Sequence, residues 1–368
     1  MKLAIISRPF VFHGGVETAT AGLVGALVGR GHEVHLYSPF GQLPVPGAVV
    51  HRIPLPPLPS LARALWLPIA AARTVRASGY EVVQSHERTL SQDIYRAGEG
   101  CHRAYLATRR GRTRPLYHRV LQALEARIFR TTPRIVAIAR RGLDEIERLY
   151  SVPPARLRVV YNGVDLERFR PDNRARYRAR VLESVGAPAD AWVVLFAGSG
   201  FERKGLAFLI EGFSRFRDRS SRLVVLGKGD ARPYRALAER LGIAARVIWQ
   251  GPRADIERWY AASDVVALPS LYEPFGNVHL EALASGVPVL ASTAAGGGEL
   301  IEIGRNGMLV APADVEAIAQ ALERLRGEPW EKLAEAARRS AEPFTYAAQA
   351  AGFERIYAEI PIARGDFR

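Results

Sequence analysis

Short apolar runs alternate with longer segments of helical periodicity along nearly the whole chain. In the first part, strands are predicted over residues 3–7, 33–37, 49–53, 81–85, 134–137 and 157–161. In the second part they are predicted over 192–197, 222–226, 246–249, 265–268 and 287–291. Helices are predicted between them, including 16–30, 61–78, 116–129, 206–217 and 234–241, and two more within 330–360. This alternation is typical of parallel sheets with crossover helices, so the sequence predicts an α/β fold.

The chain has 368 residues, more than a single hydrophobic core usually spans, which favours two domains. A polar segment over 162–173 carries an Asn-Gly turn, and we expect the boundary there. The predicted domains are 1–168 and 169–344. Two such halves facing across a cleft would bind ligand in the crevice at the carboxyl ends of their strands.

Composition narrows the class of protein. Hydrophobic residues make up 48% and charged residues 24%, which is a normal globular balance. No apolar run approaches the length of a membrane-spanning helix, and the opening apolar run is expected to be a strand rather than a signal peptide. The single cysteine, Cys101, excludes an intrachain disulfide and a cysteine metal cluster. We therefore expect a cytoplasmic protein.

The net charge of +14 is unevenly distributed. The segment from Arg96 to Arg141 holds twelve arginines but only two acids, Glu99 and Glu125. Such a field favours an anionic partner: nucleic acid, a phosphorylated glycan or acidic lipid. A general bias toward arginine codons could explain the small number of lysines, four in all, but not this clustering.

A first glycine motif, His13-Gly14-Gly15-Val16-Glu17, lies between the first strand and the first helix. Glycines there let backbone amides approach a phosphate or sugar at a helix amino end, although a plain tight turn would also need them. The G-x-G-x-x-G pattern is absent, and the second strand is not followed by a ribose-binding acid. A nicotinamide dehydrogenase is therefore disfavoured.

A second loop, Gly198-Ser199-Gly200-Phe201-Glu202-Arg203-Lys204-Gly205, follows the first strand of the second half. Arg203 and Lys204 at the start of a helix suit a diphosphate, because arginine offers a fork of donors and lysine a compact charge. Gly227-Lys228-Gly229 after the next strand adds another lysine. The alternative interpretation is a solvated basic loop.

The most informative segment runs from Glu273 to Glu281, with the sequence EPFGNVHLE. Its first glutamate lies in extended chain, and the second is one turn inside a helix that is predicted to begin near Asn277. Backbone amides at such a helix start favour anions. A carboxylate on each side could accept hydroxyls of a sugar nucleotide. The alternative is one capping acid and one surface acid.

These segments, together with Asn162-Gly163-Val164-Asp165 and Gly286-Val287-Pro288-Val289, resemble the retaining glycosyltransferases of the GT-B fold, family four. The resemblance covers nearly the whole chain. His86-Glu87-Arg88 and Gln92-Asp93-Ile94-Tyr95, followed by the basic stretch, further resemble bacterial lipopolysaccharide-core α-glucosyltransferases. The implied fold is two Rossmann-like domains, with a C-terminal helix in 345–368 that crosses back to the N-terminal domain.

The resemblance implies a role for each site residue. Glu281 would hold the ribose, Glu273 the hexose, and Arg203 and Lys204 the diphosphate. Here these two cations are adjacent, whereas many relatives separate them, so the phosphate that each meets stays open. The implied donor-binding set is Gly14, Gly15, Gly200, Gly227, Arg253, Phe275, Gly276, Asn277, Val278 and Glu281. The base would contact the loop over 250–255.

The chain has no D-x-D motif, so neither a metal-bound diphosphate nor another cofactor is expected. Cationic side chains and a helix dipole would instead stabilise the departing charge. The family is described as using front-face displacement without an enzyme nucleophile. Asp93 is our candidate for orienting the acceptor hydroxyl, although it could equally be a helix-start acid. His86 and Glu87 are further candidates on the acceptor side.

The basic stretch favours a membrane partner, since its arginines alternate with apolar residues in an amphipathic pattern. The residues expected to face an anionic surface are Arg109, Arg110, Arg112, Arg114 and Arg119. An ordinary helix with a solvated basic face is the competing interpretation. The sequence has no nucleic-acid recognition motif, so we expect no nucleic-acid partner.

The resulting prediction is a hexosyltransferase on the cytoplasmic face of the inner membrane. Its donor would be a nucleotide sugar, UDP-linked by preference, and its acceptor a glycolipid or a lipopolysaccharide-core saccharide. Three alternatives stay open: a sugar-nucleotide epimerase on the same fold, a phosphorylase, and a transferase with a soluble acceptor. A phosphorylase needs a lysine for pyridoxal phosphate, and neither Lys204 nor Lys228 lies in a suitable helix.

Overall fold

The computed structural model describes residues 1–10, 15–39, 41–75, 79–109 and 115–361. The chain divides into two compact units. Unit 1 comprises Met1–Gly163 and Phe344–Arg368, and unit 2 comprises Val164–Pro343. Among the helices in these ranges, none is both apolar and long enough to cross a bilayer.

The described part of unit 1 contains a seven-stranded parallel sheet in the order β3-β2-β1-β4-β5-β6-β7. Its strands are β1 (Lys2–Ile6), β2 (Glu33–Ser38), β3 (Ala48–Arg52), β4 (Val82–Ser85), β5 (Ile94–Arg96), β6 (Arg134–Ala137) and β7 (Leu157–Val159). Its helices are α1 (Gly15–Gly29), α2 (Ser60–Val75), α3 (His102–Ala107), α4 (Pro115–Thr131), α5 (Arg140–Tyr150), the 3₁₀ turn η1 (Pro154–Arg156) and α13 (Tyr346–Tyr357).

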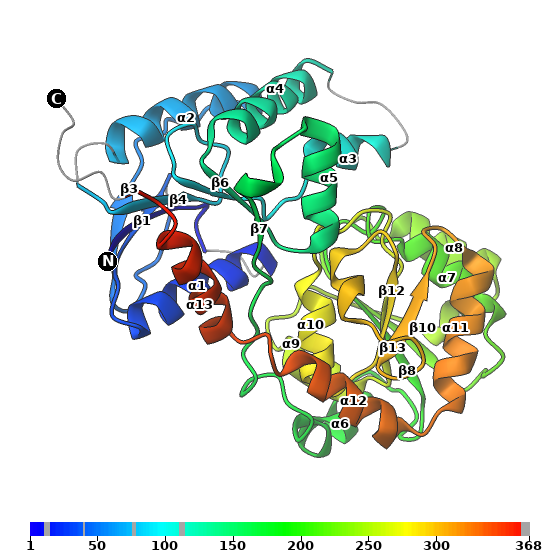
Figure 1. The fold of residues 1–368 in the computed structure, drawn as a ribbon. Helices are drawn as coiled ribbons and strands as arrows, with labels where there is room; N and C mark the ends of the chain where they lie inside the picture. Colours follow the sequence, from blue (N-terminus) through cyan, green and yellow to red (C-terminus); the bar gives the residue numbers. More distant parts are fainter. Residues whose placement is uncertain (11–14, 40, 76–78, 110–114, 362–368) are drawn as a thin grey trace. The chain divides into compact units, whose positions relative to one another are not determined.

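Alternation along β1 sends side chains into the helix layers on both faces of this sheet. Leu3 and Ile5 join a core with α1 and α13, whereas Ala4 and Ile6 join a core with α2. The helices α1 and α13 pack against each other, and α2 and α4 lie together on the opposite face (Figure 1). Because both faces of the sheet are covered at β1, this strand is apolar without interruption from Leu3 to Ile6, which is why the sequence pattern identified it.

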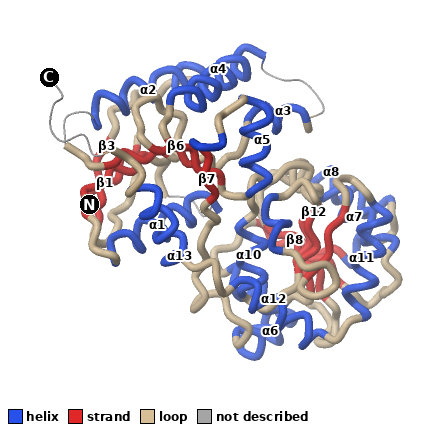
Figure 2. The backbone as a smooth tube through the Cα atoms, in the orientation of Figure 1, coloured by secondary structure: helices blue, strands red, loops and turns tan. Residues whose placement is uncertain are grey.

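Unit 2 has a six-stranded parallel sheet, in the order β10-β9-β8-β11-β12-β13, within its described residues. Its strands are β8 (Val193–Ala197), β9 (Arg222–Leu226), β10 (Val247–Gly251), β11 (Val265–Leu268), β12 (Val289–Ser292) and β13 (Gly307–Val310). Its helices are α6 (Asn173–Ser184), α7 (Leu206–Arg215), α8 (Arg232–Arg240), α9 (Ile256–Ala262), α10 (Asn277–Ala284), α11 (Val315–Gly327) and α12 (Trp330–Ala341). Unit 2 also contains the 3₁₀ turns η2 (Ala244–Arg246) and η3 (Gly296–Leu300). Figure 2 distinguishes the helices, in blue, from the strands, in red, in each unit.

The predicted fold class is therefore confirmed: two parallel-sheet α/β units of the Rossmann type. The terminal helix α13 belongs to unit 1, where Phe353, Ile356 and Tyr357 complete the core beneath α1. The central strands of unit 2 all run parallel, so the loops at their carboxyl ends meet at one edge of the sheet. That edge carries most of the predicted donor-binding residues.

Candidate functional site

The candidate donor site is built from loops that follow neighbouring strands of unit 2. The loop after β8 carries Arg203 and Lys204, and the loop after β11 carries Glu273. Backbone bonds hold the two loops together, since the amide of Leu271 donates to the carbonyl oxygen of Arg203 at 2.8 Å. Residues about seventy positions apart in sequence therefore become neighbours.

Glu273 is the centre of a compact ion cluster. Its Oε2 accepts hydrogen bonds from Lys204 Nζ at 2.8 Å and from Arg203 Nη1 at 2.9 Å. Arg203 Nη1 also donates to the carbonyl of Tyr272 at 2.8 Å. Lys204 and Glu273 are 7% and 9% exposed, so this ion pair is buried. The structure thus brings together residues from two segments, the Arg203-Lys204 loop and the segment that begins at Glu273.

Burial disfavours the charged form of Glu273, but the nearby Lys204 and Arg203 outweigh it and lower the pKa of the carboxyl to about 2. Glu273 is therefore a fixed anion at neutral pH. It holds both cations at the edge of the sheet, and a bound diphosphate would meet cations that are already in position.

Gly198 makes room for the lysine. A Cβ at this position would lie 2.5 Å from Lys204 Cε and 2.6 Å from Cδ, and its φ of 146° is one that residues with a side chain rarely adopt. Gly227 borders the same spot, because its own Cβ would fall 2.1 Å from the carbonyl oxygen of Gly198. The amide of Gly200 donates to the carbonyl of Lys228 at 3.3 Å, which joins the loop over 198–205 to the loop over 227–229.

The second glutamate, Glu281, lies on α10 and is half-buried. Tyr260 of α9 donates its hydroxyl to Glu281 Oε2 at 2.8 Å. Burial raises the pKa of Glu281, and the Tyr260 hydrogen bond opposes that rise. The helix α10 begins at Asn277, as predicted, after the buried Phe275 and after Gly276. The loop that carries Glu273 therefore leads directly into the amino end of α10, which includes Val278.

His279 lies beneath this turn and was not singled out by the sequence. It is fully buried, and a Cβ on either Gly276 or Gly297 would come within 2.7 Å of its Nδ1. Burial, with Lys204 nearby, lowers the pKa of His279 to about 4, so the ring is neutral at pH 7. A neutral imidazole adds no charge beneath the Lys204–Glu273 pair.

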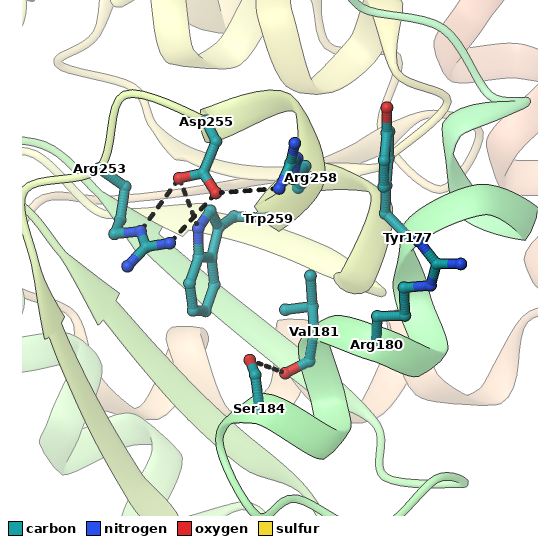
Figure 3. Close-up of a pocket in the computed structure, with 8 residues that line it drawn as sticks. All are labelled: Tyr177, Arg180, Val181, Ser184, Arg253, Asp255, Arg258 and Trp259. Carbon is teal, nitrogen blue, oxygen red and sulfur yellow. Dashed lines mark hydrogen bonds and ion pairs between the residues drawn. The ribbon is translucent and has the colours of Figure 1, made fainter.

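The predicted donor-binding residue Arg253 is already paired with another side chain of the protein. Its guanidinium pairs with Asp255, at 3.0 Å for Nε–Oδ1 and 3.1 Å for Nη2–Oδ2, and lies over the ring of Trp259. Figure 3 shows this arrangement at a cavity of about 250 Å³ between α6 and the start of α9. The cavity is lined by Tyr177, Arg180, Val181, Ser184, Arg253, Asp255, Arg258 and Trp259, and includes neither glutamate of the donor site.

The acceptor candidates lie in unit 1, where His86 and Glu87 follow β4. His86 is buried, with Nδ1 3.2 Å from Thr20 Oγ1 and Nε2 2.7 Å from Gln84 Nε2. Burial lowers its pKa well below the usual value, and the charge of Arg96 lowers it further. Glu87 Oε1 accepts a hydrogen bond from Arg8 Nε at 2.9 Å. These groups share the carboxyl edge of the sheet.

Asp93 does not lie with them, contrary to our expectation. It directly precedes β5, and its Oδ2 accepts the amide of Val83 at 2.8 Å inside the sheet. Burial raises the pKa of this carboxyl. A carboxylate that bonds the backbone within β4 supports strand pairing, and nothing in this position favours the predicted role on the acceptor hydroxyl.

The remaining predicted residues lie in unit 1, and some of them are outside the part of the chain that the structure describes. Gly14, Arg110, Arg112 and Arg114 lie outside the described residues, while Gly15 begins α1. Arg109 and Arg119 are both exposed. In the described ranges, no group of three or more His, Cys, Asp or Glu side chains could hold a metal ion.

Sequence reasoning also missed Tyr260 and Gly198. No motif marks Tyr260, because its role depends on α9 packing beside α10. Gly198 did belong to a predicted loop, but its contact with the Lys204 side chain depends on the path of that side chain across the loop.

Two family models match the chain. The model described as "Glycosyltransferase Family 4" matches residues 13–168, and "Glycosyl transferases group 1" matches residues 191–327. Together they cover most of both units.

Curated relatives agree with these matches. A D-inositol 3-phosphate glycosyltransferase of Xylanimonas cellulosilytica is 31% identical and covers 94% of this chain and 92% of its own length. An uncharacterized glycosyltransferase of Methanocaldococcus jannaschii is 28% identical over 88% of this chain and 89% of its own. A D-inositol 3-phosphate glycosyltransferase of Streptomyces bingchenggensis is 34% identical, but the match spans only 54% of that protein.

Solved structures share the fold. WaaG, a glycosyltransferase involved in lipopolysaccharide biosynthesis, superposes with a TM-score of 0.81 at 23% identity, over 99% of this chain and 100% of its own. Anabaena HepE in complex with UDP and glucose has a TM-score of 0.78 at 20% identity, over 98% of this chain and 100% of its own. At these identities the likeness concerns architecture.

Proposed function

This chain belongs to the glycosyltransferases of the GT-B fold, with family 4 and group 1 domains, and we propose that it transfers a hexose from a UDP-sugar to a lipid-linked or lipopolysaccharide-core saccharide, with retention. The observation that carries this proposal is the cluster of buried Glu273 and Lys204 with half-buried Arg203 at the carboxyl edge of the unit 2 sheet. A diphosphate needs fixed cations, and a hexose needs a fixed hydrogen-bond acceptor beside them.

In the proposed reaction, the bond between the anomeric carbon and the distal phosphate oxygen breaks. The acceptor hydroxyl oxygen bonds to that carbon from the same face, and its proton passes to the departing phosphate. UDP is the leaving group. Arg203, Lys204 and the amino end of α10 stabilise its growing negative charge, and no enzyme nucleophile or metal ion takes part.

Glu273 and Glu281 divide the recognition of the donor. Glu281, held by Tyr260, accepts the ribose hydroxyls, and Glu273 accepts hydroxyls of the hexose. UDP and glucose in the HepE complex, and the involvement of WaaG in lipopolysaccharide biosynthesis, support the proposed donor and acceptor classes. Among the described residues, Arg109 and Arg119 would face an anionic membrane that carries the acceptor.

The test removes the ion cluster one partner at a time. Glu273→Gln and Lys204→Ala should each lower kcat/KM for transfer at least 100-fold. Lys204→Ala removes a cation that stabilises the leaving group, and Glu273→Gln removes the anion that holds both cations and accepts the hexose hydroxyls. Glu202→Gln, an exposed glutamate in the same loop, and Lys332→Ala, an exposed lysine on α12, are the matched controls. Retained turnover in Glu273→Gln would refute the site assignment.

Donor identity needs a separate measurement. A ligand that binds only the folded state raises the melting temperature according to its affinity. UDP-sugars should stabilise the protein more than ADP-, GDP- or TDP-sugars at equal concentration. If no nucleotide sugar raises the melting temperature, the proposed donor class is wrong.

A second candidate acceptor is a soluble cyclitol phosphate, and the 31% identical D-inositol 3-phosphate glycosyltransferase favours it. The two candidates separate in one assay. With a UDP-sugar as donor, transfer to inositol phosphate in a detergent-free solution supports the soluble acceptor, whereas transfer only to a glycolipid acceptor supports the first proposal.

A further inference from the structure

The outer face of α2 exposes three large apolar side chains. Leu65, Trp66 and Ile69 are 50%, 40% and 44% exposed. The opposite face of the same helix is buried against the sheet through Ala70, Ala71 and Val75. Exposed apolar side chains scattered singly are ordinary, but three on one helix face form a patch. We refer to Leu65, Trp66 and Ile69 as the apolar ridge.

Helical spacing aligns the ridge with basic residues. Leu65, Ile69 and the exposed Arg73 are four positions apart in turn, so they lie along one side of the helix with Trp66 beside them. Arg63 is also exposed, near the start of the helix. The helix sequence over 60–75 contains no acidic residue.

The neighbouring helix α4 carries a matching surface. Its exposed side chains include Leu116, which is 63% exposed, and the three arginines Arg119, Arg127 and Arg130. We call these three arginines the basic stripe. The single acid of α4, Glu125, is fully buried and accepts the amide of His102 at 2.9 and 3.0 Å. The stripe is therefore not neutralised by an acid on its own helix.

The two helices cover the same face of the sheet. Register pairs Ile6 with Ser85, Ser85 with Tyr95, and Tyr95 with Ile135, so these side chains point to one side. The residues of α2 pack against Ile6, and those of α4 against Tyr95 and Ile135. Figures 1 and 2 show α2 and α4 side by side over this face. The ridge and the stripe consequently face outward together.

We propose that the apolar ridge of α2 inserts among the headgroups of an anionic lipid bilayer while the basic stripe of α4 lies against the lipid phosphates. This inference rests on the proposed function, in which the acceptor is carried by a lipid. It extends the membrane-facing surface from the arginine-rich stretch to α2. Tryptophan with aliphatic side chains, bordered by arginines, suits the interface between headgroups and acyl chains.

The charge pattern selects this partner over two others. A second copy of the chain would bring arginines against arginines, with no exposed acid on either described helix to compensate them. Nucleic acid would attract the arginines, but it offers no apolar layer for Leu65 and Ile69. A bilayer with acidic lipids supplies both an anionic surface and an apolar layer.

Trp66 provides a direct probe. The chain has five tryptophans, and the other four, Trp192, Trp249, Trp259 and Trp330, all belong to unit 2. Vesicles of phosphatidylglycerol and phosphatidylcholine with brominated acyl chains should quench the wild-type fluorescence. Trp66→Phe should remove most of that quenching while still binding the vesicles. Equal quenching in the wild type and in Trp66→Phe would overturn the proposed insertion.

Two double variants separate the apolar and charged contributions. Trp66→Ser with Ile69→Ser should lower vesicle partitioning at least 10-fold, including the part that persists in 1 M salt, where charges are screened. Arg119→Glu with Arg127→Glu should lower partitioning at least 10-fold at low salt only. The controls on unit 2 are Ile303→Ser with Leu241→Ser, and Arg217→Glu with Arg240→Glu, all at exposed positions.

All variants should keep the wild-type melting temperature and UDP binding, since every altered side chain is exposed. Vesicle binding without UDP binding in the wild type would refute the proposed transferase reaction and leave this inference standing. UDP binding without vesicle binding would refute the inference alone. Preferential binding to duplex DNA over anionic vesicles, or control variants as weak as the ridge variants, would also overturn it.

Discussion

At the residue scale, the position of Lys204 depends on the missing side chain of Gly198. Gly198→Ala would put a methyl group 2.5 Å from Lys204 Cε and 2.6 Å from Cδ, too close for the lysine to keep its place, and would also strain the backbone. We expect Lys204 to leave Glu273, and UDP binding to weaken at least 10-fold. Gly242→Ala is the control, because Gly242 also has a positive φ, of 69°, but has open space around it. If both variants lose UDP affinity equally, backbone strain rather than the lysine contact explains the loss.

The ionised carboxyl of Glu273 should also make the free energy of unfolding depend on pH in the acid range. Its folded pKa, about 2, lies below its ordinary value of 4.5, because Lys204 and Arg203 outweigh burial. The unfolded chain therefore takes up this proton first as the pH falls. The stabilisation is complete above about pH 5 and is lost between there and pH 2, amounting to roughly 3 kcal/mol.

The measurement is the difference in free energy of unfolding between wild type and Glu273→Gln, from denaturant titrations between pH 7 and pH 3. That difference should shrink toward low pH, because the glutamine variant lacks the titrating group. A difference that stays constant with pH would mean that the carboxyl is not held as a buried anion.

Residue types and loop positions were predictable at the donor site, but side-chain contacts were not. The sequence placed Arg203, Lys204 and Glu273 in loops that parallel strands bring to one edge. It could not indicate that Arg253 is already paired with Asp255, or that Asp93 bonds the β4 backbone. Such contacts depend on rotamers and on neighbours distant in sequence.

At the scale of elements, burial explains which strands the sequence predicted. The runs over 134–137, 222–226 and 265–268 match β6, β9 and β11 because, after a leading arginine in the first two, each is apolar and buried. Strand β5 was missed, since it has three residues and ends in the buried Arg96, whose Nη2 donates to Asn162 Oδ1 at 2.6 Å.

The junction before α13 gives a prediction for this scale. A Cβ on Gly163 would lie 2.6 Å from the backbone nitrogen and Cα of Tyr346, and the Gly163 amide donates to Gln349 Oε1 at 3.2 Å. Gly163→Ala should therefore push α13 away and destabilise unit 1 by about 1–3 kcal/mol. Thermal unfolding with hydrogen exchange of α13 measures this loss.

Gly142 on α5 is the matched control, because the nearest atom to its Cβ would be the Ala137 methyl at an ordinary 3.8 Å. Gly142→Ala should leave stability unchanged or raise it by up to about 1 kcal/mol, since alanine favours the helix. A Gly163→Ala protein as stable as Gly142→Ala would mean that α13 tolerates the displacement.

At the scale of the whole molecule, the chain crosses between the units twice, at Gly163–Val164 and at Pro343–Phe344. Its last helix returns to unit 1, where Ala350, Phe353 and Tyr357 are buried with residues of α1 and β1. The preceding helix, α12, belongs to unit 2. Its Arg338 Nη1 donates to the carbonyls of Phe169 and Ala284, both at 2.9 Å. Unit 2 is therefore one continuous stretch of chain, whereas unit 1 is made of two stretches.

This continuity leads to a prediction for the separated parts. Residues 164–343 contain Arg203, Lys204, Glu273, Tyr260 and Glu281, so this fragment should fold alone and bind UDP within about 10-fold of the full chain, without transferring sugar. A chain ending at Pro343 should keep that UDP affinity but unfold unit 1 at a lower temperature, because the core loses the side chains of α13. Calorimetry of UDP binding and of thermal unfolding measures both effects. A folded fragment that does not bind UDP would show that donor binding requires residues of unit 1, with Gly15 the first to examine.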